Sequence, residues 1–264
     1  MTQKERRVFL IDCLLKENPG YRTARIPDDE REQKRLLRSL MNVRPPQDTS
    51  EEFLRIQDEY LRETIREGGI TDLAQLKPLA AQGNGTFYLW QGDITRLKVD
   101  AIVNAANSAM TGCWQPCHAC IDNCIHTFAG VQLRAVCAGI MQKQGHEEPT
   151  GSAKITSAFN LPCKYVIHTV GPIVQGRLQK KHEEQLASCY RSCLELADQH
   201  KVRSIAFCCI STGVFMFPNR PAAEIAVATV RKYFEQTGSE IKVVFNVFKD
   251  EDLAIYSLYL QRTN

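Results

Sequence analysis

The segment Gly112 to His126 reads GCWQPCHACIDNCIH and holds four cysteines and two histidines within fifteen residues. Thiolates and imidazoles are ligands that Zn²⁺ prefers in proteins. Three explanations fit this composition: a closed structural metal site, a catalytic metal site with one open position, or small buried residues at the start of a helix. The spacing differs from a zinc finger with paired CxxC motifs, so the segment alone does not choose among them.

Length and composition limit the classes to which the chain can belong. Its 264 residues, 44% of them hydrophobic, can bury one large domain, or one domain with an extension. A net charge of +3 is close to the globular average and indicates no polybasic surface, so nucleic acid is not an expected partner. The N-terminus mixes apolar and charged positions, which fits neither a signal peptide nor a membrane span, and we expect a cytosolic protein. In such a chain, eleven cysteines indicate metal binding, redox chemistry or buried thiols.

The first 80 residues differ from the remainder because 30 of them are charged. Apolar residues at spacings of three and four in segments 7–17, 28–43 and 50–69 predict three amphipathic helices. Their apolar faces must bury against something. We therefore expect residues 1–80 to form a helical N-terminal extension packed on a main domain of residues 84–264.

The remainder alternates short β-branched and aromatic runs with helical patterns. Strands that are apolar on both faces and alternate with helices predict a sheet covered by helices on both sides. In such folds, ligands bind at the carboxyl ends of the strands. The expected strands are 87–94, 99–106, 152–159, 164–170, 204–210 and 241–248, and the expected helices are 121–144, 181–200, 221–237 and 250–260.

Three expected strand ends carry polar loops that packing does not explain: Gly92 to Thr95, Asn104 to Ser108, and Ser211 to Phe215. Each loop alone reads equally well as a turn, since Asp, Asn, Ser and Gly all favour turns. The third loop leads into a helix, where small residues let backbone N–H groups converge on phosphate oxygens, and it lacks the lysine of a Walker motif. Jointly, the three loops predict a cleft for a nucleotide-like ligand.

Five motifs resemble the macrodomain family in their order and approximate spacing. The resemblance covers roughly residues 86–264 and implies a three-layer α/β/α sandwich with a mixed central sheet that binds ADP-ribose. Many members hydrolyse ADP-ribose from proteins, so the resemblance also implies a hydrolase. The motifs are GDIT (92–95), VDAIVNAANS (99–108), HTVGP (168–172), ISTGVFMFP (210–218) and VFKDEDLAIY (247–256).

The same resemblance assigns residues to the adenine and ribose of the ligand. Asp93 pairs with the adenine amino group, Ile94 is a backbone contact beside it, and Phe248 stacks on the adenine ring. Asn107 holds the distal ribose. Asn104, the first asparagine of that motif, is placed with the ligand-binding residues.

The resemblance places the diphosphate on one loop. Phe215 also covers the distal ribose, and Met216 stands where many hydrolytic members carry glycine. The backbone amides that wrap the diphosphate are those of Ser211, Thr212, Gly213, Val214 and Phe215.

The cysteine and histidine segment resembles a zinc-containing subgroup of macrodomains with the loop Gly-Cys-x-x-Pro-x-His-x-Cys. This resemblance makes Cys113, His118 and Cys120 the metal ligands, with one Zn²⁺ per chain as cofactor. Two thiolates and one imidazole suit tetrahedral zinc and leave a fourth position for water or substrate. A fourth protein ligand, Cys117 or Cys124, is the structural rival that closes the site.

Asp122 lies at the start of an expected helix, where an acid also stabilises the helix terminus without any chemistry. It aligns with the catalytic Asp of the family. The resemblance thus implies a zinc-dependent hydrolase that removes mono-ADP-ribose from side chains, acid-linked Asp or Glu being expected because a carboxylate leaves easily. Asp122 orients or deprotonates the attacking water, and Asn107 fixes the ribose. Two alternatives use the same pocket: an ADP-ribose-binding reader with structural zinc, and an O-acetyl-ADP-ribose deacetylase.

The expected partner is an ADP-ribosylated protein, with ADP-ribose as the product and no membrane involved. Relatives in the zinc subgroup are associated with class M sirtuins and lipoyl-carrier proteins. The resemblance therefore implies a lipoyl-carrier protein, modified by such a sirtuin, as one substrate. Residues 1–80 show no motif with a chemical role, and we expect them to cap the main domain or to recognise the modified partner.

Overall fold

Three helices open the chain, whose computed structural model describes residues 1–21, 24–82 and 85–261. They are α1 (Gln3–Glu17), α2 (Glu30–Val43) and α3 (Glu51–Glu67). Each follows a residue whose side chain accepts a hydrogen bond from a backbone N–H of the first turn, and these capping residues are Thr2, Asp29 and Ser50. The prediction of three N-terminal helices is confirmed.

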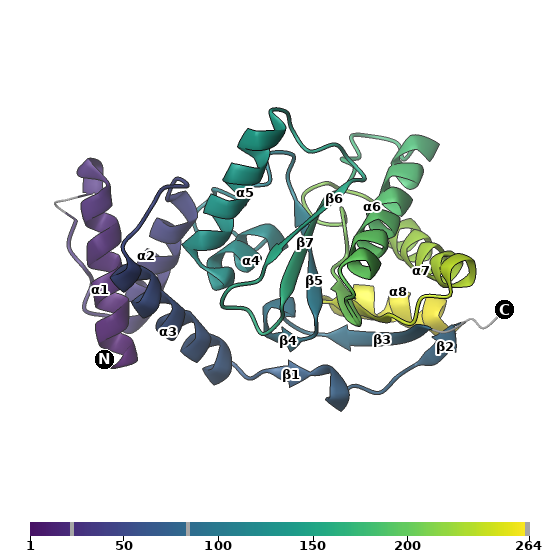
Figure 1. Cartoon of the computed structure of the whole chain (residues 1–264), viewed down its shortest axis with the longest axis horizontal. Coiled ribbons are helices and arrows are strands. Elements are labelled where there is room, and N and C mark those ends of the chain that lie inside the picture. Colours follow the sequence, from purple (N-terminus) through teal and green to yellow (C-terminus); the bar gives the residue numbers. More distant parts are fainter. Residues whose placement is uncertain (22–23, 83–84, 262–264) are drawn as a thin grey trace.

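The three N-terminal helices bury their apolar faces mainly against one another. Leu10 and Ile11 of α1, Leu37 of α2 and Phe53 of α3 share one buried cluster, to which the main part of the chain adds Val131. These faces therefore bury less against the main domain than expected. Figure 1 shows α1, α2 and α3 grouped at one end of the molecule.

Among the described residues the main sheet has seven strands, and six of them match the six expected strands to within a few residues. In spatial order they are β2 (Ala80–Gln82), β3 (Gly85–Gln91), β9 (Lys242–Val247), β8 (Ser204–Phe207), β5 (Ala101–Ala106), β7 (Tyr165–Val170) and β6 (Ala153–Ser157). The edge strands β2 and β6 run antiparallel to their neighbours, whereas the inner pairs are parallel. The predicted mixed sheet is confirmed.

Three of the observed strands were not predicted, and one of them is β2 at the edge of the main sheet. The pair β1 (Thr71–Asp72) and β4 (Leu97–Lys98) is parallel and forms a small second sheet. Strands of two residues are too short to show an alternating pattern. Short 3₁₀ helices occur at Pro19–Tyr21, Leu73–Gln75 and Ile94–Arg96.

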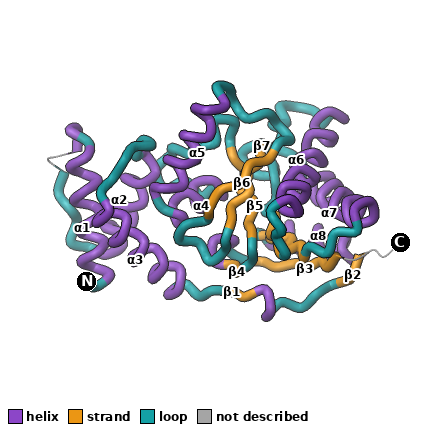
Figure 2. Tube along the Cα trace, viewed as in Figure 1, coloured by secondary structure: helices purple, strands orange, loops and turns teal. Residues whose placement is uncertain are grey.

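Helices cover both faces of the main sheet, as the fold class requires. Figure 1 shows α4 and α5 on one side of the strands and α6, α7 and α8 on the other, and Figure 2 shows the strands gathered between these groups. The bounds are α4 (Ile121–Ala129), α5 (Val131–Gln144), α6 (Lys180–Gln199), α7 (Asn219–Thr237) and α8 (Asp250–Gln261).

The single helix predicted over residues 121–144 is wrong, because the chain breaks at Gly130. This residue has φ 102°, outside the range of helical backbone, and the two helices meet at 111°. A lone glycine in a helical pattern is often tolerated, so the pattern did not mark the break. No single helix among the described residues has the length and apolar character to cross a bilayer, and α4 with α5 reaches that limit only as a bent pair.

The parallel strands bring four loops to one edge of the sheet. Strands β3, β9, β8 and β5 are consecutive and parallel, so their carboxyl ends point the same way. The segments that follow them begin at Gly92, Phe248, Cys208 and Asn107. Loops that are far apart in the sequence therefore share one region of the molecule.

Candidate active site

The structure brings the three predicted metal ligands together. The ligand atoms of Cys113, His118 and Cys120 all lie within 4.8 Å of one another, and each residue is half-buried. The sulfur of Cys113 is 3.6 Å from Nδ1 of His118. Cys120 is also the N-cap of α4, where its sulfur accepts a hydrogen bond from the backbone N–H of Asn123. The start of a helix thus fixes one ligand.

The loop that carries these ligands turns sharply at two positions. Gly112 has φ 81° and Cys117 has φ 55°. A side chain at Gly112 would also collide with the ring of His126, whose Cγ lies 2.8 Å from the position of the missing Cβ. Position 112 therefore requires glycine for both its backbone conformation and its space.

The donor set and its spacing fit a zinc ion. Bonds of about 2.3 Å to sulfur and about 2.0 Å to nitrogen at a tetrahedral angle separate the two ligand atoms by about 3.5 Å. The sulfur of Cys113 and the ring nitrogen of His118 are 3.6 Å apart. Burial raises the pKa of the Cys120 thiol, and metal binding requires loss of that proton.

Neither rival cysteine points its sulfur into this cluster. The sulfur of Cys117 lies 3.1 Å from Oγ of Ser39 and 3.4 Å from the carbonyl oxygen of Arg35, so it faces α2. The sulfur of Cys124 lies 3.5 Å from Nη2 of Arg38, which is also on α2. This geometry favours three protein ligands over four.

Asp122 is held beside the metal ligands by two asparagines. Asn104 donates to Oδ1 of Asp122 at 2.8 Å, and Asn107 donates to Oδ2 at 3.2 Å. Asn107 also donates to the carbonyl oxygen of Gly112, at 3.0 Å. This bond links Asp122 to residues 111–120, the loop with the three predicted metal ligands (the metal loop). The carboxylate is almost completely buried, and this burial raises its pKa to about 6, although both asparagines favour the charged form.

Asn104 does not present its side chain to an open pocket. It is fully buried, and its amide group donates to Nδ1 of His168 at 3.2 Å as well as to Asp122. Since an amide N–H₂ only donates, Nδ1 of His168 is the acceptor and Nε2 carries the proton. Nε2 therefore donates to Oγ1 of Thr156, and these two atoms are 2.9 Å apart. The predicted ligand contact through this side chain has no geometric support; the side chain supports Asp122 instead.

A second group of potential metal ligands lies next to Asp122, whose Oδ1 is 3.6 Å from Nε2 of His126. Potential ligand atoms of His126, Cys137 and His168 also approach within 4.8 Å of one another, and all three residues are buried. Both ring nitrogens of His168 are already hydrogen-bonded, to Asn104 and Thr156, so the group does not offer three free ligands. Burial lowers the pKa of His168 to about 3 and that of His126 well below its ordinary value, which keeps both rings neutral.

The residues expected at the adenine end lie where β3 and β9 finish. Oδ1 of Asp93 accepts from the backbone N–H and the hydroxyl of Thr95, at 3.0 and 2.6 Å, which caps a 3₁₀ turn and leaves Oδ2 near Arg96. Ile94 is buried under this turn. Phe248 exposes 75% of its surface and is therefore free to pack on a planar ligand.

The expected diphosphate loop connects β8 to α7. Ser211 is buried with φ 66°, and the backbone N–H groups of Met216 and Phe217 donate to the carbonyls of Gly213 and Ser211. Val174 donates to the carbonyl of Phe215 from a neighbouring loop. Within the described ranges, the N–H groups of residues 213–215 make no hydrogen bond, so three successive amides are available to an anion.

Sequence reasoning missed the residues that support the metal loop from outside. Arg38 and Asn42 of α2 and Arg134 of α5 all bond to backbone groups of residues 111–118. Their partners are distant in sequence, and Arg38 is 80 positions from His118. An arginine on the polar side of a predicted helix gives no signal that it meets another part of the chain.

A mixed sheet between two helix layers, with free amides at the ends of its parallel strands, is an architecture of nucleotide-binding α/β proteins. The profile of the Macro domain matches residues 103–226. A protein from Treponema medium named protein-ADP-ribose hydrolase is 71% identical over 97% of this chain and 98% of its own length. The chain therefore belongs to the macrodomain family.

Other relatives extend this match. A protein-ADP-ribose hydrolase of Staphylococcus aureus strain MSSA476 is 51% identical over 97% of this chain and 95% of its own length. The solved macrodomain of Oceanobacillus iheyensis with MES bound shares 36% identity at a TM-score of 0.64, covering 70% of this chain and 95% of that one. The Trypanosoma brucei macrodomain in complex with ADP-ribose shares 31% identity at a TM-score of 0.64. This match covers 80% of this chain and 91% of that one.

Proposed function

We propose that the protein is a zinc-dependent hydrolase that removes mono-ADP-ribose from modified protein side chains. Two relatives that match nearly its whole length bear the name protein-ADP-ribose hydrolase. The observation that carries the proposal is the position of Asp122, whose carboxylate is bonded to Asn107, the residue that also holds the start of the metal loop at Gly112.

The reaction breaks the bond between the anomeric carbon of the distal ribose and the oxygen of the modified side chain. Water provides the new oxygen on that carbon and releases one proton, and the side-chain carboxylate leaves as an anion. Positive charge develops on the ribose ring and negative charge on the leaving oxygen. Zn²⁺ held by Cys113, His118 and Cys120 would supply Lewis acidity at this centre.

In this proposal Asp122 is the catalytic residue, and the two asparagines determine its geometry. Each asparagine occupies one carboxylate oxygen, so the group cannot rotate freely. A fixed carboxylate can accept a hydrogen bond from the attacking water and orient its lone pair toward the anomeric carbon. Asn107 also contacts the ribose in this proposal, which its lesser burial compared with Asn104 supports.

The remainder of the ligand is bound away from the bond that breaks. The free amides of residues 213–215 bind the diphosphate, and Phe215 of the same loop covers the distal ribose. Asp93 accepts from the adenine amino group beside Ile94, and the exposed ring of Phe248 stacks on the base. Binding energy from these contacts orients the distal ribose.

Metal removal tests the role of zinc. The protein is incubated with a chelator, and release of ADP-ribose from an acid-linked ADP-ribosylated protein is measured before and after Zn²⁺ is restored. We expect turnover to fall on chelation and to return with zinc. Full turnover in the metal-free protein would overturn the zinc dependence and leave a metal-independent hydrolase.

The variant Asp122→Ala separates a hydrolase from a reader. We expect turnover to fall by about 100-fold or more. ADP-ribose binding, measured by calorimetry, should change little. A reader would show no turnover in the parent protein, so equal and negligible release from both proteins contradicts the hydrolase.

We also propose the chemical class of the acceptor residue and the partner protein. Acid-linked ADP-ribose on Asp or Glu is the substrate that the leaving-group chemistry favours, and a lipoyl-carrier protein modified by a class M sirtuin is the proposed cytosolic partner. Comparing release from acid-linked and serine-linked versions of one carrier protein tests both parts. Faster release from the serine linkage would contradict the acceptor assignment.

A further inference from the structure

Helix α2 contacts the metal loop through a half-buried arginine. Nη2 of Arg38 donates to the carbonyl oxygen of His118 at 2.8 Å and to Oδ1 of Asn123 at 2.9 Å. The first contact fixes the backbone of a metal ligand. The second fixes the side chain of Asn123, which in turn donates to the carbonyl oxygens of Gln115, at 2.9 Å, and Cys113, at 3.4 Å.

The same helix face holds the tight turn of the loop at Cys117. Oδ1 of Asn42 accepts from the backbone N–H of Cys117 at 2.9 Å, while its amide donates to Oγ1 of Thr127 in α4 at the same distance. Oγ of Ser39 lies 3.1 Å from the sulfur of Cys117. Because Cys117 has the unfavourable φ of 55°, these contacts stabilise a turn that its own residue type does not prefer.

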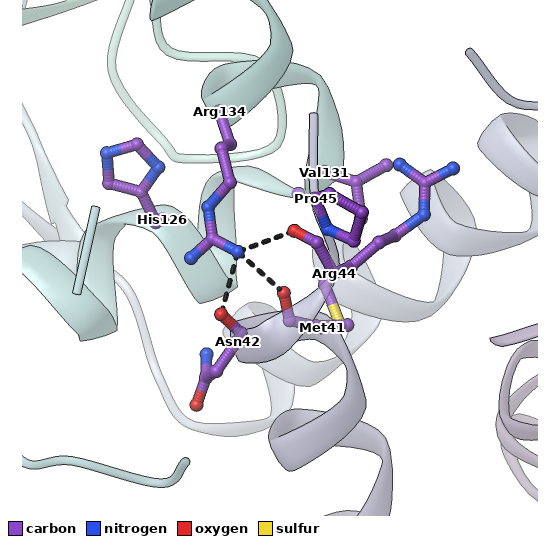
Figure 3. Close-up of a pocket in the computed structure, with 8 residues that line it drawn as sticks. Met41, Asn42, Arg44, Pro45, His126, Val131 and Arg134 are labelled. Atoms are coloured by element: carbon purple, nitrogen blue, oxygen red, sulfur yellow. Dashed lines mark hydrogen bonds between the residues drawn. The ribbon is translucent and has the colours of Figure 1, made fainter. Parts of the chain in front are cut away.

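Arg134 of α5 joins the end of α2 to the start of the metal loop. Figure 3 shows its guanidinium directed at the carbonyl oxygens of Met41, Asn42 and Arg44, and the two shortest of these bonds are 2.7 Å. A cation at a helix C-terminus satisfies carbonyls that lack helical partners. Its Nε also donates to the carbonyl oxygen of Thr111 at 2.7 Å. The cavity that these groups line measures only about 10 Å³.

We propose that α2 holds the metal loop in its ligating conformation, with Arg38, Asn42 and Arg134 as positioning residues. The loop has little regular structure between Cys113 and Cys120, so its ligand geometry depends on outside support. Helix α2 can give that support because its apolar side is anchored in the core of the N-terminal helices. This inference rests on the proposed function, since it assumes a metal at the cluster, and it assigns a role to residues 1–80.

Zinc affinity measures this role independently of catalysis. Each protein competes with a chromophoric chelator for Zn²⁺, and the dissociation constant is read from the absorbance. We expect Arg38→Ala to weaken zinc binding by about 10-fold or more, the loss typical when groups that orient metal ligands are removed. Arg35→Ala is the matched control, because Arg35 is an exposed arginine on the same helix whose backbone, not its side chain, contacts the loop. It should bind zinc like the parent protein.

A second variant tests whether misfolding, and not the loss of the hydrogen bonds, explains a weaker zinc affinity. Arg38→Leu removes every donor and keeps an aliphatic side chain on the helix, and it should weaken zinc binding as the alanine variant does. Parent-like zinc affinity in either Arg38 variant overturns the inference while the zinc site itself stands. If the parent protein binds no zinc, both the zinc dependence in the proposed function and this inference are wrong.

Discussion

Asp122 and its two asparagines show that neighbouring residues of one motif have different tasks. Asn104 and Asn107 both donate to the carboxylate, yet Asn104 is fully buried and bonds inward to His168, whereas Asn107 bonds outward to the metal loop. Each asparagine restrains one oxygen of Asp122. Loss of the inner asparagine should therefore affect catalysis without affecting ligand contact.

The variant Asn104→Ala tests this division. Without the inner donor, Oδ1 of Asp122 loses its 2.8 Å bond and the carboxylate can rotate. We expect kcat to fall by about 10- to 100-fold, since small misplacements of catalytic groups have effects of that size. The KM for the modified protein and the dissociation constant of ADP-ribose should stay near the parent values. A large rise in that dissociation constant, with kcat unchanged, would restore the direct ligand contact expected from the sequence.

The family resemblance could predict that Cys113, His118 and Cys120 form one cluster, because these residues are close together in the chain. Cys113, His118, Cys120 and Asp122 lie within ten consecutive residues whose composition packing does not explain. Arg38 and Arg134 were not predictable, because their partners in the loop are 80 and 23 positions away. The direction of Asn104 was equally hidden, since a strand buried on both faces shows no alternation from which to read it.

The break between α4 and α5 is the element that the helical pattern concealed. It lets α4 present Cys120 and Asp122 at its start while α5 turns away and places Arg134 against α2. The other helices end within two residues of the predicted bounds, except that α1 begins four residues earlier than predicted. These helices contain no internal glycine with positive φ. At Gly130 tertiary contacts decide the backbone, and periodicity carries no information about them.

The variant Gly130→Ala tests the need for this break. An added Cβ would lie 2.6 Å from Oε1 of Gln132 and 2.7 Å from Nε2 of Gln57, at a φ that alanine disfavours. We expect the free energy of unfolding, measured in urea, to fall by about 1 to 3 kcal/mol or more. Gly139→Ala in the middle of α5 is the control, because nothing lies within 4 Å of its added Cβ. That substitution should raise stability by about 0.5 to 1 kcal/mol, and equal losses in both variants would contradict the argument.

At the scale of the whole molecule, the protein has two hydrophobic cores, and hydrogen bonds between polar groups connect the parts that contain them. The main core lies around the sheet, and the N-terminal helices have a core of their own. The contacts of Arg38, Asn42 and Arg134 with the metal loop lie between them. The amphipathic patterns predicted the three helices. The spacing of apolar residues does not show whether a helix packs on the other N-terminal helices or on the main domain.

The buried histidines beneath the site couple the stability of the whole fold to pH. Burial lowers the pKa of His168 to about 3, whereas an unfolded chain protonates this residue near its ordinary value of about 6.5. Between these values the unfolded state binds more protons, so the free energy of unfolding falls as pH falls through this window. His126 acts in the same direction, and Asp122, with its raised pKa, acts in the opposite one.

The variant His168→Gln separates the pH dependence due to His168 from that of His126 and Asp122, because those two residues are present in both proteins. The free energy of unfolding is measured in urea at pH 6.5 and pH 5.0, with a chelator present so that metal release does not contribute. We expect the parent protein to lose about 1.5 kcal/mol more than the variant over this interval, because only the parent has His168 to protonate on unfolding. The variant should be the less stable protein at pH 6.5, since it loses the bonds to Asn104 and Thr156. Parallel pH dependence in the two proteins would show that position 168 is not held neutral by burial.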